Sequence, residues 1–128
     1  MTAKVRMPYA QAVDAVTAAL RREGFGVLTT IDVKRTLKEK VGADFGEYVI
    51  LGACNPALAY SALMDDIEVG LLLPCNVTVR EDGQGSIVSI LDPGLMARLS
   101  DAEGLQRVAM IAREKLERVL EEMKGGTK

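Results

Sequence analysis

Two Cys-Asn pairs are the residues of this chain whose types and positions allow chemistry. The only two cysteines directly precede the only two asparagines, in Cys54-Asn55 and Cys75-Asn76. Two thiols at one site can bind a soft metal such as Cu(I) or cycle between dithiol and disulfide. The amides can contact a small ligand. All four residues are therefore candidate ligand-binding residues, and Cys54 with Cys75 form an alternative metal or redox site.

Each pair also has a structural interpretation. Asn is a preferred helix N-cap and Pro a preferred first helical residue, so helix initiation alone explains Asn55-Pro56. Cys54 is then either a buried, unreactive side chain or a thiol whose thiolate is stabilised by the helix N-terminus. Asn76 lies in a β segment, although asparagine is disfavoured in strands. Its side-chain amide must therefore form hydrogen bonds with a neighbouring loop, a dimer partner or a ligand.

The direction of the strands decides whether the two pairs meet. If the strand ending at Ala53 and the strand starting at Cys75 were parallel, the pairs would lie roughly 15–20 Å apart. The segment Glu81-Asp82-Gly83-Gln84-Gly85 is typical of a hairpin turn and favours an antiparallel sheet. We therefore predict that both pairs share one end of the sheet and line one pocket.

Composition excludes several classes of function. The chain has no histidine, which rules out Ser-His-Asp and Cys-His catalysis and imidazole-ligated zinc. A net charge of −2, a pI near 5.2 and 4% aromatic residues do not suit nucleic-acid binding. Asp32 and Asp92 could form an acid pair, but a helix cap and a turn explain them. We assign no catalytic residue and no cofactor, and favour a non-enzymatic role.

The length and mean hydropathy of the chain indicate one domain that has more apolar side chains than the core of a small monomer needs. The N-terminal segment leads into no sustained apolar run, so we expect no signal peptide or membrane span, a cytoplasmic location and free thiols. A mean hydropathy of +0.13 beside 27% charged residues indicates either a subunit interface or a large core with few aromatics. We expect a single domain over residues 1–124 and a frayed tail over residues 125–128.

Hydrophobic periodicity predicts two long helices and about five strands. The long helices run from Pro8 to about Glu23 and from a capping box formed by Ser100 and Glu103 to residue 124. Shorter helices follow Asp32 and Asn55, and an apolar stretch spans residues 69–73. We expect strands at residues 5–7, 25–31, 47–53, 75–80 and 86–91, the second with Phe25, Val27, Thr29 and Ile31 on one side.

These elements predict an α+β fold. The expected architecture is a β-α-β-β-β-β-α sandwich, in which the sheet is mostly antiparallel and the two long helices cover one of its faces. The uncovered face is then the natural place for an interface or a ligand.

The ordered motifs of the chain resemble the domain-of-unknown-function 302 family over nearly the whole length. The resemblance implies a fold similar to that of the TATA-binding protein and association as a homodimer. It implies no activity, and DNA binding does not follow from a fold. The segments that carry it are Gly24-Phe25-Gly26-Val27-Leu28-Thr29, Ile31-Asp32-Val33, Leu51-Gly52-Ala53-Cys54-Asn55-Pro56, Gly70-Leu71-Leu72-Leu73-Pro74-Cys75-Asn76-Val77 and Asp92-Pro93.

The chain departs from the family pattern at two points. Other branches carry the equivalent of Asn55-Pro56 without cysteines at positions 54 and 75, so a thiol mechanism belongs to this branch at most. Thr30 stands where an acidic residue is expected in close relatives, which weakens a carboxylate-based mechanism.

Three hypotheses follow for the function. The leading one is a non-enzymatic homodimeric module that binds a small molecule or a partner near the Cys-Asn end of the sheet. The alternatives are a thiol-based redox or soft-metal protein, and a structural dimer with no ligand. We expect neither nucleic acid nor membrane as a partner.

Overall fold

Five antiparallel strands form one open sheet in the computed structural model, which describes residues 1–100 and 102–125. The spatial order of the strands is β1-β5-β4-β3-β2. Every neighbouring pair is antiparallel, which confirms the predicted sheet. The strands are β1 (Thr2–Val5), β2 (Gly26–Asp32), β3 (Tyr48–Cys54), β4 (Cys75–Asp82) and β5 (Gly85–Ile90).

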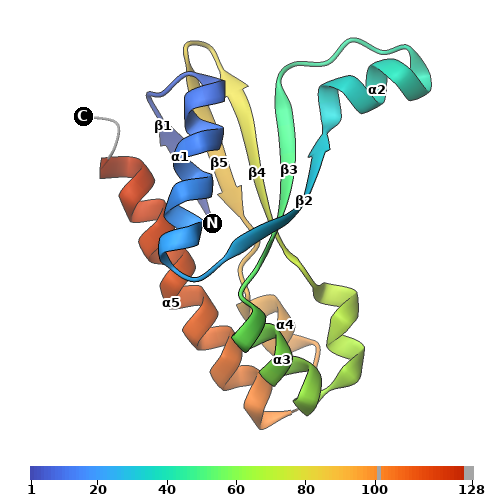
Figure 1. The fold of residues 1–128 in the computed structure, drawn as a ribbon, viewed down its shortest axis with the longest axis vertical. Helices are drawn as coiled ribbons and strands as arrows, with labels where there is room; N and C mark the ends of the chain where they lie inside the picture. Colours follow the sequence, from blue (N-terminus) through green and yellow to red (C-terminus); the bar gives the residue numbers. More distant parts are fainter. Residues whose placement is uncertain (101, 126–128) are drawn as a thin grey trace.

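Two long helices cover one face of this sheet, as predicted. Figure 1 shows α1 and α5 side by side against the strands, while α2 lies at the other end of β2, away from both. The helices are α1 (Tyr9–Arg22), α2 (Val33–Val41), α3 (Pro56–Asp65), the 3₁₀ helix η1 (Ile67–Leu72), α4 (Gly94–Arg98) and α5 (Glu103–Gly125). The α+β class is therefore confirmed; η1 and α4 add to the predicted element order.

The core lies between the sheet and the two long helices because alternate strand residues point to one side. Val49 and Leu51 of β3 and Val77 and Val79 of β4 are buried against this layer. From α5 the predicted apolar stripe is buried throughout, at Leu105, Val108, Ala109, Ala112, Leu116, Val119, Leu120 and Met123.

Among the described residues, no helix packs along the length of the opposite side of the sheet, and we call this side the open face. In Figure 1 the open face lies on the side away from α1 and α5. Helix α2 is at one end of this side, and the yellow-green segment η1, which follows α3, is at the other end. Its residues alternate with the core residues along the strands, and the strand register aligns them in rows. The central residues of the open face are Thr29, Ile31, Ile50, Gly52, Asn76, Thr78, Arg80, Ile87 and Ser89.

A bulge in β2 corrects one prediction about this face. Val27 pairs with Ala53 on the core side, whereas Thr29 pairs with Gly52 on the open face. Leu28 is the additional residue between these pairs. Because a bulge shifts the alternation by one residue, Val27 and Thr29 do not lie on the same side, and the predicted single-sided arrangement is wrong.

Two predicted boundaries are also wrong. The first strand lies at Thr2–Val5 instead of residues 5–7, because these residues pair with β5. The capping box does not form, since α5 begins at Glu103. The Ser100 hydroxyl instead donates to Asp66 Oδ2 at 2.9 Å and accepts from the Ala102 amide at 3.3 Å.

The end of α5 bears on the predicted tail. Gly125 is the last residue of the helix, and the remainder of that predicted segment lies outside the described residues. Within residues 1–100 and 102–125, no helix combines the length and apolar character needed to span a membrane.

We predict that Leu116→Ala destabilises the protein by about 2–5 kcal/mol, because it leaves a cavity where α5 meets the sheet. The control is Met110→Ala on the same helix, at a side chain that is mostly exposed; it should stay within about 0.5 kcal/mol of the parent. Chemical denaturation followed by circular dichroism measures both. Equal effects from the two variants would contradict this account of the core.

Candidate functional site

The pairing of β3 with β4 brings the two Cys-Asn pairs together. Ala53 pairs with Cys75, and Gly52 pairs with Asn76. Both pairs therefore lie at the same end of the sheet, where β3 ends and β4 begins. The predicted antiparallel arrangement and shared end are confirmed.

Three of the four candidate residues line one small pocket. Cys54, Asn55 and Cys75 border it together with apolar side chains that include Phe25 and Met96. Its water-accessible volume is about 20 Å³, which is room for about one water molecule. The pocket therefore has no space for a metabolite unless the surrounding side chains move.

Asn55 is the N-cap of α3, as its structural interpretation predicts. Its Oδ1 accepts a hydrogen bond from the Leu58 amide at 3.2 Å, and Pro56 is the first helical residue. The Asn55 amide nitrogen also lies against Gly24, whose φ is +86°; a Cβ on Gly24 would come within 2.9 Å of that nitrogen. Asn55 thus joins the start of α3 to the turn that follows α1.

Burial makes both thiols less acidic. Cys54 is half-buried and Cys75 is buried, and neither forms a disulfide. Burial raises the pKa of both thiols, and a charge on nearby Cys54 would raise the pKa of Cys75 further. The raised pKa of Cys54, caused by desolvation, fits the unreactive interpretation of this thiol.

Metal coordination by the thiols would need further ligands. Across the part of the chain that the structure describes, no three His, Cys, Asp or Glu residues are grouped so that they could hold a metal ion. Each chain thus offers two sulfur ligands, whereas closed thiolate sites generally use more.

Asn76 lies on the open face and not in the pocket. Because successive strand residues point to opposite sides, Asn76 faces away from Cys75. Its side chain is exposed. It is next to Gly52, where a Cβ would collide with Thr29 Oγ1 and lie 2.9 Å from Pro74 Cγ. The four candidates are therefore divided: three line the pocket and Asn76 belongs to the open face.

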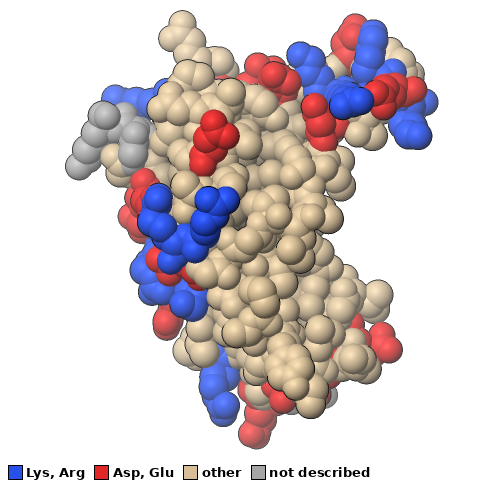
Figure 2. Space-filling model, viewed as in Figure 1, with Lys and Arg blue, Asp and Glu red and all other residues tan. Residues whose placement is uncertain are grey.

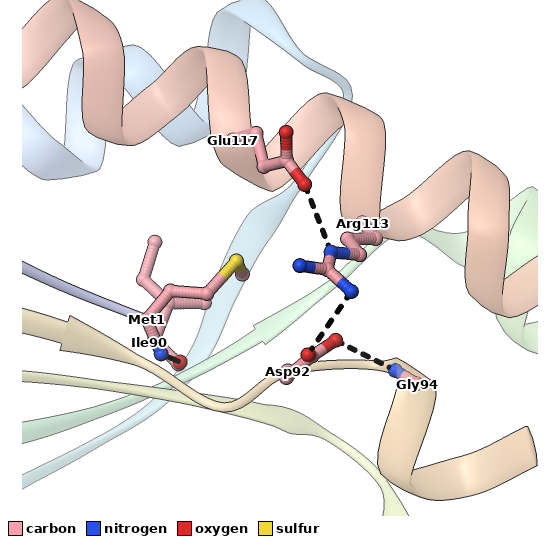
Figure 3. A network of polar contacts seen from close by, with 6 residues as sticks. All are labelled: Met1, Ile90, Asp92, Gly94, Arg113 and Glu117. Atoms are coloured by element: carbon pink, nitrogen blue, oxygen red, sulfur yellow. Dashed lines mark hydrogen bonds and ion pairs between the residues drawn. The ribbon is translucent and has the colours of Figure 1, made fainter.

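Asp32 and Asp92 have the structural roles expected of a cap and a turn. Asp32 Oδ1 accepts from the Arg35 amide at 3.0 Å and caps α2. Asp92 Oδ1 accepts from the Gly94 amide at 2.8 Å, and its other oxygen lies 3.4 Å from the Arg113 guanidinium. Figure 3 shows this network, in which Arg113 also donates to a carboxylate one helical turn later.

Helix α2 is a functional candidate that the sequence did not single out. Val33, Leu37 and Val41 recur at four-residue spacing and indicate an amphipathic helix. That pattern usually marks a side packed on the core, yet no residue of α2 is buried. The signal for an apolar surface was therefore present in the sequence, but only the structure shows that Val33 and Leu37 are partly buried and that Val41 is exposed.

Comparison with known proteins identifies relatives of unknown function. The family model described as domain of unknown function DUF302 matches residues 1–123. The solved structures similar to this chain include a crystal structure of an uncharacterized conserved protein DUF302 from Bacillus stearothermophilus, at 28% sequence identity and a TM-score of 0.88. The match covers 97% of each chain. No curated protein matches the chain significantly.

We predict slow thiol modification at neutral pH. Because the pKa of each thiol is higher in the folded state, a thiol-reactive disulfide reagent should label the protein slowly near pH 7 and faster toward about pH 9. Cys54 should react before the more buried Cys75, so Cys54→Ser removes the faster phase. The stability that these protonated thiols contribute is complete at neutral pH and is lost as pH rises through their folded pKa values. Rapid labelling at pH 7 would contradict the burial argument.

We predict that the two asparagines differ in stability. Asn55→Ala should cost about 1 kcal/mol because the Leu58 amide loses its acceptor, while Asn55→Asp should retain most of the cap. Asn76→Ala should change stability by less than about 0.5 kcal/mol, because this side chain is exposed. Urea denaturation compares the three variants. Equal losses at both positions would show that Asn76 also has a structural role.

Proposed function

This chain belongs to the DUF302 family of domains of unknown function, and from that premise we propose that it is a non-enzymatic homodimeric binding module that engages its partner copy through the open face of the sheet. The observation that carries this proposal is the residue content of that face, which combines isoleucines with small hydroxyl side chains.

The open face is more apolar than a solvent-exposed sheet face needs to be. A sheet with one solvated face normally alternates apolar residues inside with polar residues outside. Here Ile31 and Ile50 lie on the outer side, in one row with Thr78 and Ser89. Ile87 lies on the same side but is already buried within the chain, at 9% exposure. Ile31 is 47% exposed. Burial of such residues against a second copy would stabilise a dimer.

Apart from Arg80 among the central residues of the open face, most of the charge lies away from the middle of the molecule. Figure 2 shows Lys, Arg, Asp and Glu gathered over α2 and along the α5 side, with a largely uncharged surface between them. Depletion of charge at the centre and charged residues at the margin are typical of protein interfaces. Asn76 on the open face would supply a polar contact within the interface.

Partner binding suits the geometry better than binding of a small molecule. The pocket beside Cys54 and Cys75 has room for about one water molecule, while ligand pockets for metabolites are on the order of several hundred Å³. The open face has no such limit.

A thiol-based redox or soft-metal function is the second candidate. The observation in its favour is that Cys54 and Cys75 border the same pocket. The raised pKa values of both thiols disfavour it at neutral pH. A dimer could combine four sulfurs only if the two pockets met, and the open face and the pocket lie on opposite sides of the Cys75-Asn76 peptide.

We predict a dimer in solution that depends on the open face. At about 10 μM, a concentration above the Kd of most stable homodimers, sedimentation velocity should give twice the chain mass. Ile31→Lys should shift this species to the monomer without changing the circular dichroism spectrum, because a lysine would be buried at the interface without a partner.

Met110→Lys is the matched control, since it replaces an exposed apolar side chain on α5 by the same residue. It should leave the dimer intact. A wild-type chain that sediments as a monomer at this concentration would overturn the proposed function.

A further inference from the structure

Helix α2 has an apolar side that its own chain covers only in part. Val33, Leu37 and Val41 lie along one side at four-residue spacing. Val33 and Leu37 are partly buried where the helix contacts β2 and β3, and Val41 at the far end of the helix is exposed. Val41 is 69% exposed, and Phe45 after the helix is 48% exposed. We call residues 33–45 the α2 arm. Figure 1 shows it projecting from the end of β2, with no other helix beside it.

A helix of this length needs a packing surface. α2 has nine residues, and isolated helices shorter than about 12–15 residues are marginal in water. The Asp32 cap and the left-handed Gly42 at the C-terminus stabilise its ends. They leave Val41 exposed at the end of the apolar side, and most helix stability in proteins comes from packing of that side.

The opposite end of the open face carries a second exposed apolar surface. It is formed by Tyr60, Met64, Ile67 and Leu71 of α3 and η1, and we call residues 60–71 the α3–η1 corner. Ile67 is 76% and Leu71 is 85% exposed. Exposed apolar residues that gather in one place mark interaction surfaces, whereas single ones need no explanation.

The charges of the two surfaces are complementary. Helix α2 carries four cationic residues against the single carboxylate of Glu39. Its Lys40 takes part in none of the ion pairs found in residues 1–100 and 102–125. The corner carries Asp65, Asp66 and Glu68 and no cation, and Asp65 and Glu68 likewise lie outside the ion pairs of this part of the chain. An arm that meets the corner therefore pairs apolar with apolar and cation with anion.

We propose that the α2 arm docks in trans on the α3–η1 corner of a second copy of this chain. The inference rests on the homodimer proposed above and specifies how its two copies engage. A two-fold axis makes each surface of one copy meet its complement on the other. Because the arm and the corner stand at opposite ends of the open face, an antiparallel pair of copies forms both contacts at once.

An anionic lipid surface is a poorer occupant for the arm. Glu39 pairs with Arg35, and Asp44 pairs with Lys38 within the same segment. Glu47 lies 3.8 Å from Lys34. These carboxylates offset most of the basic charge that would attract anionic lipid. The contact proposed with the corner uses Lys40, which lies outside these ion pairs.

A charge-exchange experiment tests the docking. We would prepare Lys40→Glu and Glu68→Lys chains, each of which places like charges at both arm–corner contacts of its own homodimer. Each variant should form a dimer about tenfold weaker than the wild type, as expected for like charges placed at an interface. In a mixed dimer of the two variants, both contacts regain opposite charges. Native mass spectrometry of an equal mixture should therefore show mixed dimers in excess of the random proportion.

The second variant tests the apolar part of the contact. Val41→Asp should shift the dimer to the monomer, while its circular dichroism spectrum stays unchanged because this side chain is not part of the core. Met110→Asp is the matched control on α5.

Each outcome has a distinct meaning. If wild-type chains are monomeric, the homodimer and the docked arm are both overturned. If the wild type is dimeric but the mixture is random and Val41→Asp remains a dimer, only the arm inference is overturned. Binding of the wild type, but not Val41→Asp, to phosphatidylserine vesicles together with a random mixture would assign the arm to lipid instead.

Discussion

The antiparallel pairing of β3 with β4 is the interaction on which the rest of the structure depends. It aligns Leu51 with Val77 and Val49 with Val79, so that the central apolar residues of both strands enter one core. The same register places Gly52 beside Asn76 on the other side. A shift of one residue would exchange the two sides. The division of the molecule into a helix-covered face and an open face therefore follows from this single register.

Much of this fold could be predicted from the sequence because its signals are local. The eight buried positions of α5 follow a helical period that a sequence shows directly. Asn55 and Asp32 are capping residues whose partners lie three residues away, at Leu58 and Arg35. To predict that the two Cys-Asn pairs meet, it was enough to know that β3 and β4 are antiparallel, and the hairpin that follows β4 indicated this direction.

The features that the sequence did not predict depend on distant partners. The bulge at Leu28 exists only relative to β3, so the pattern of β2 alone does not reveal it. In place of the capping box, the Ser100 hydroxyl donates to Asp66, 34 residues earlier in the chain. The pKa of Cys54 is raised by burial among side chains from several elements. The spacing of the apolar residues predicted helix α2 correctly, but this spacing does not indicate which part of the structure packs against the apolar side.

The bulge in β2 has a consequence for how copies of this chain can associate. β2 is an outer strand of the sheet, and outer strands expose unpaired backbone groups to which further strands can add. A bulge disrupts the regular row of donors and acceptors and twists the strand, and the other outer strand, β1, is only four residues long. Neither border of the sheet therefore offers a long, flat template for edge-to-edge growth. The fold can leave apolar side chains uncovered on its face while resisting open-ended, fibre-like polymerisation.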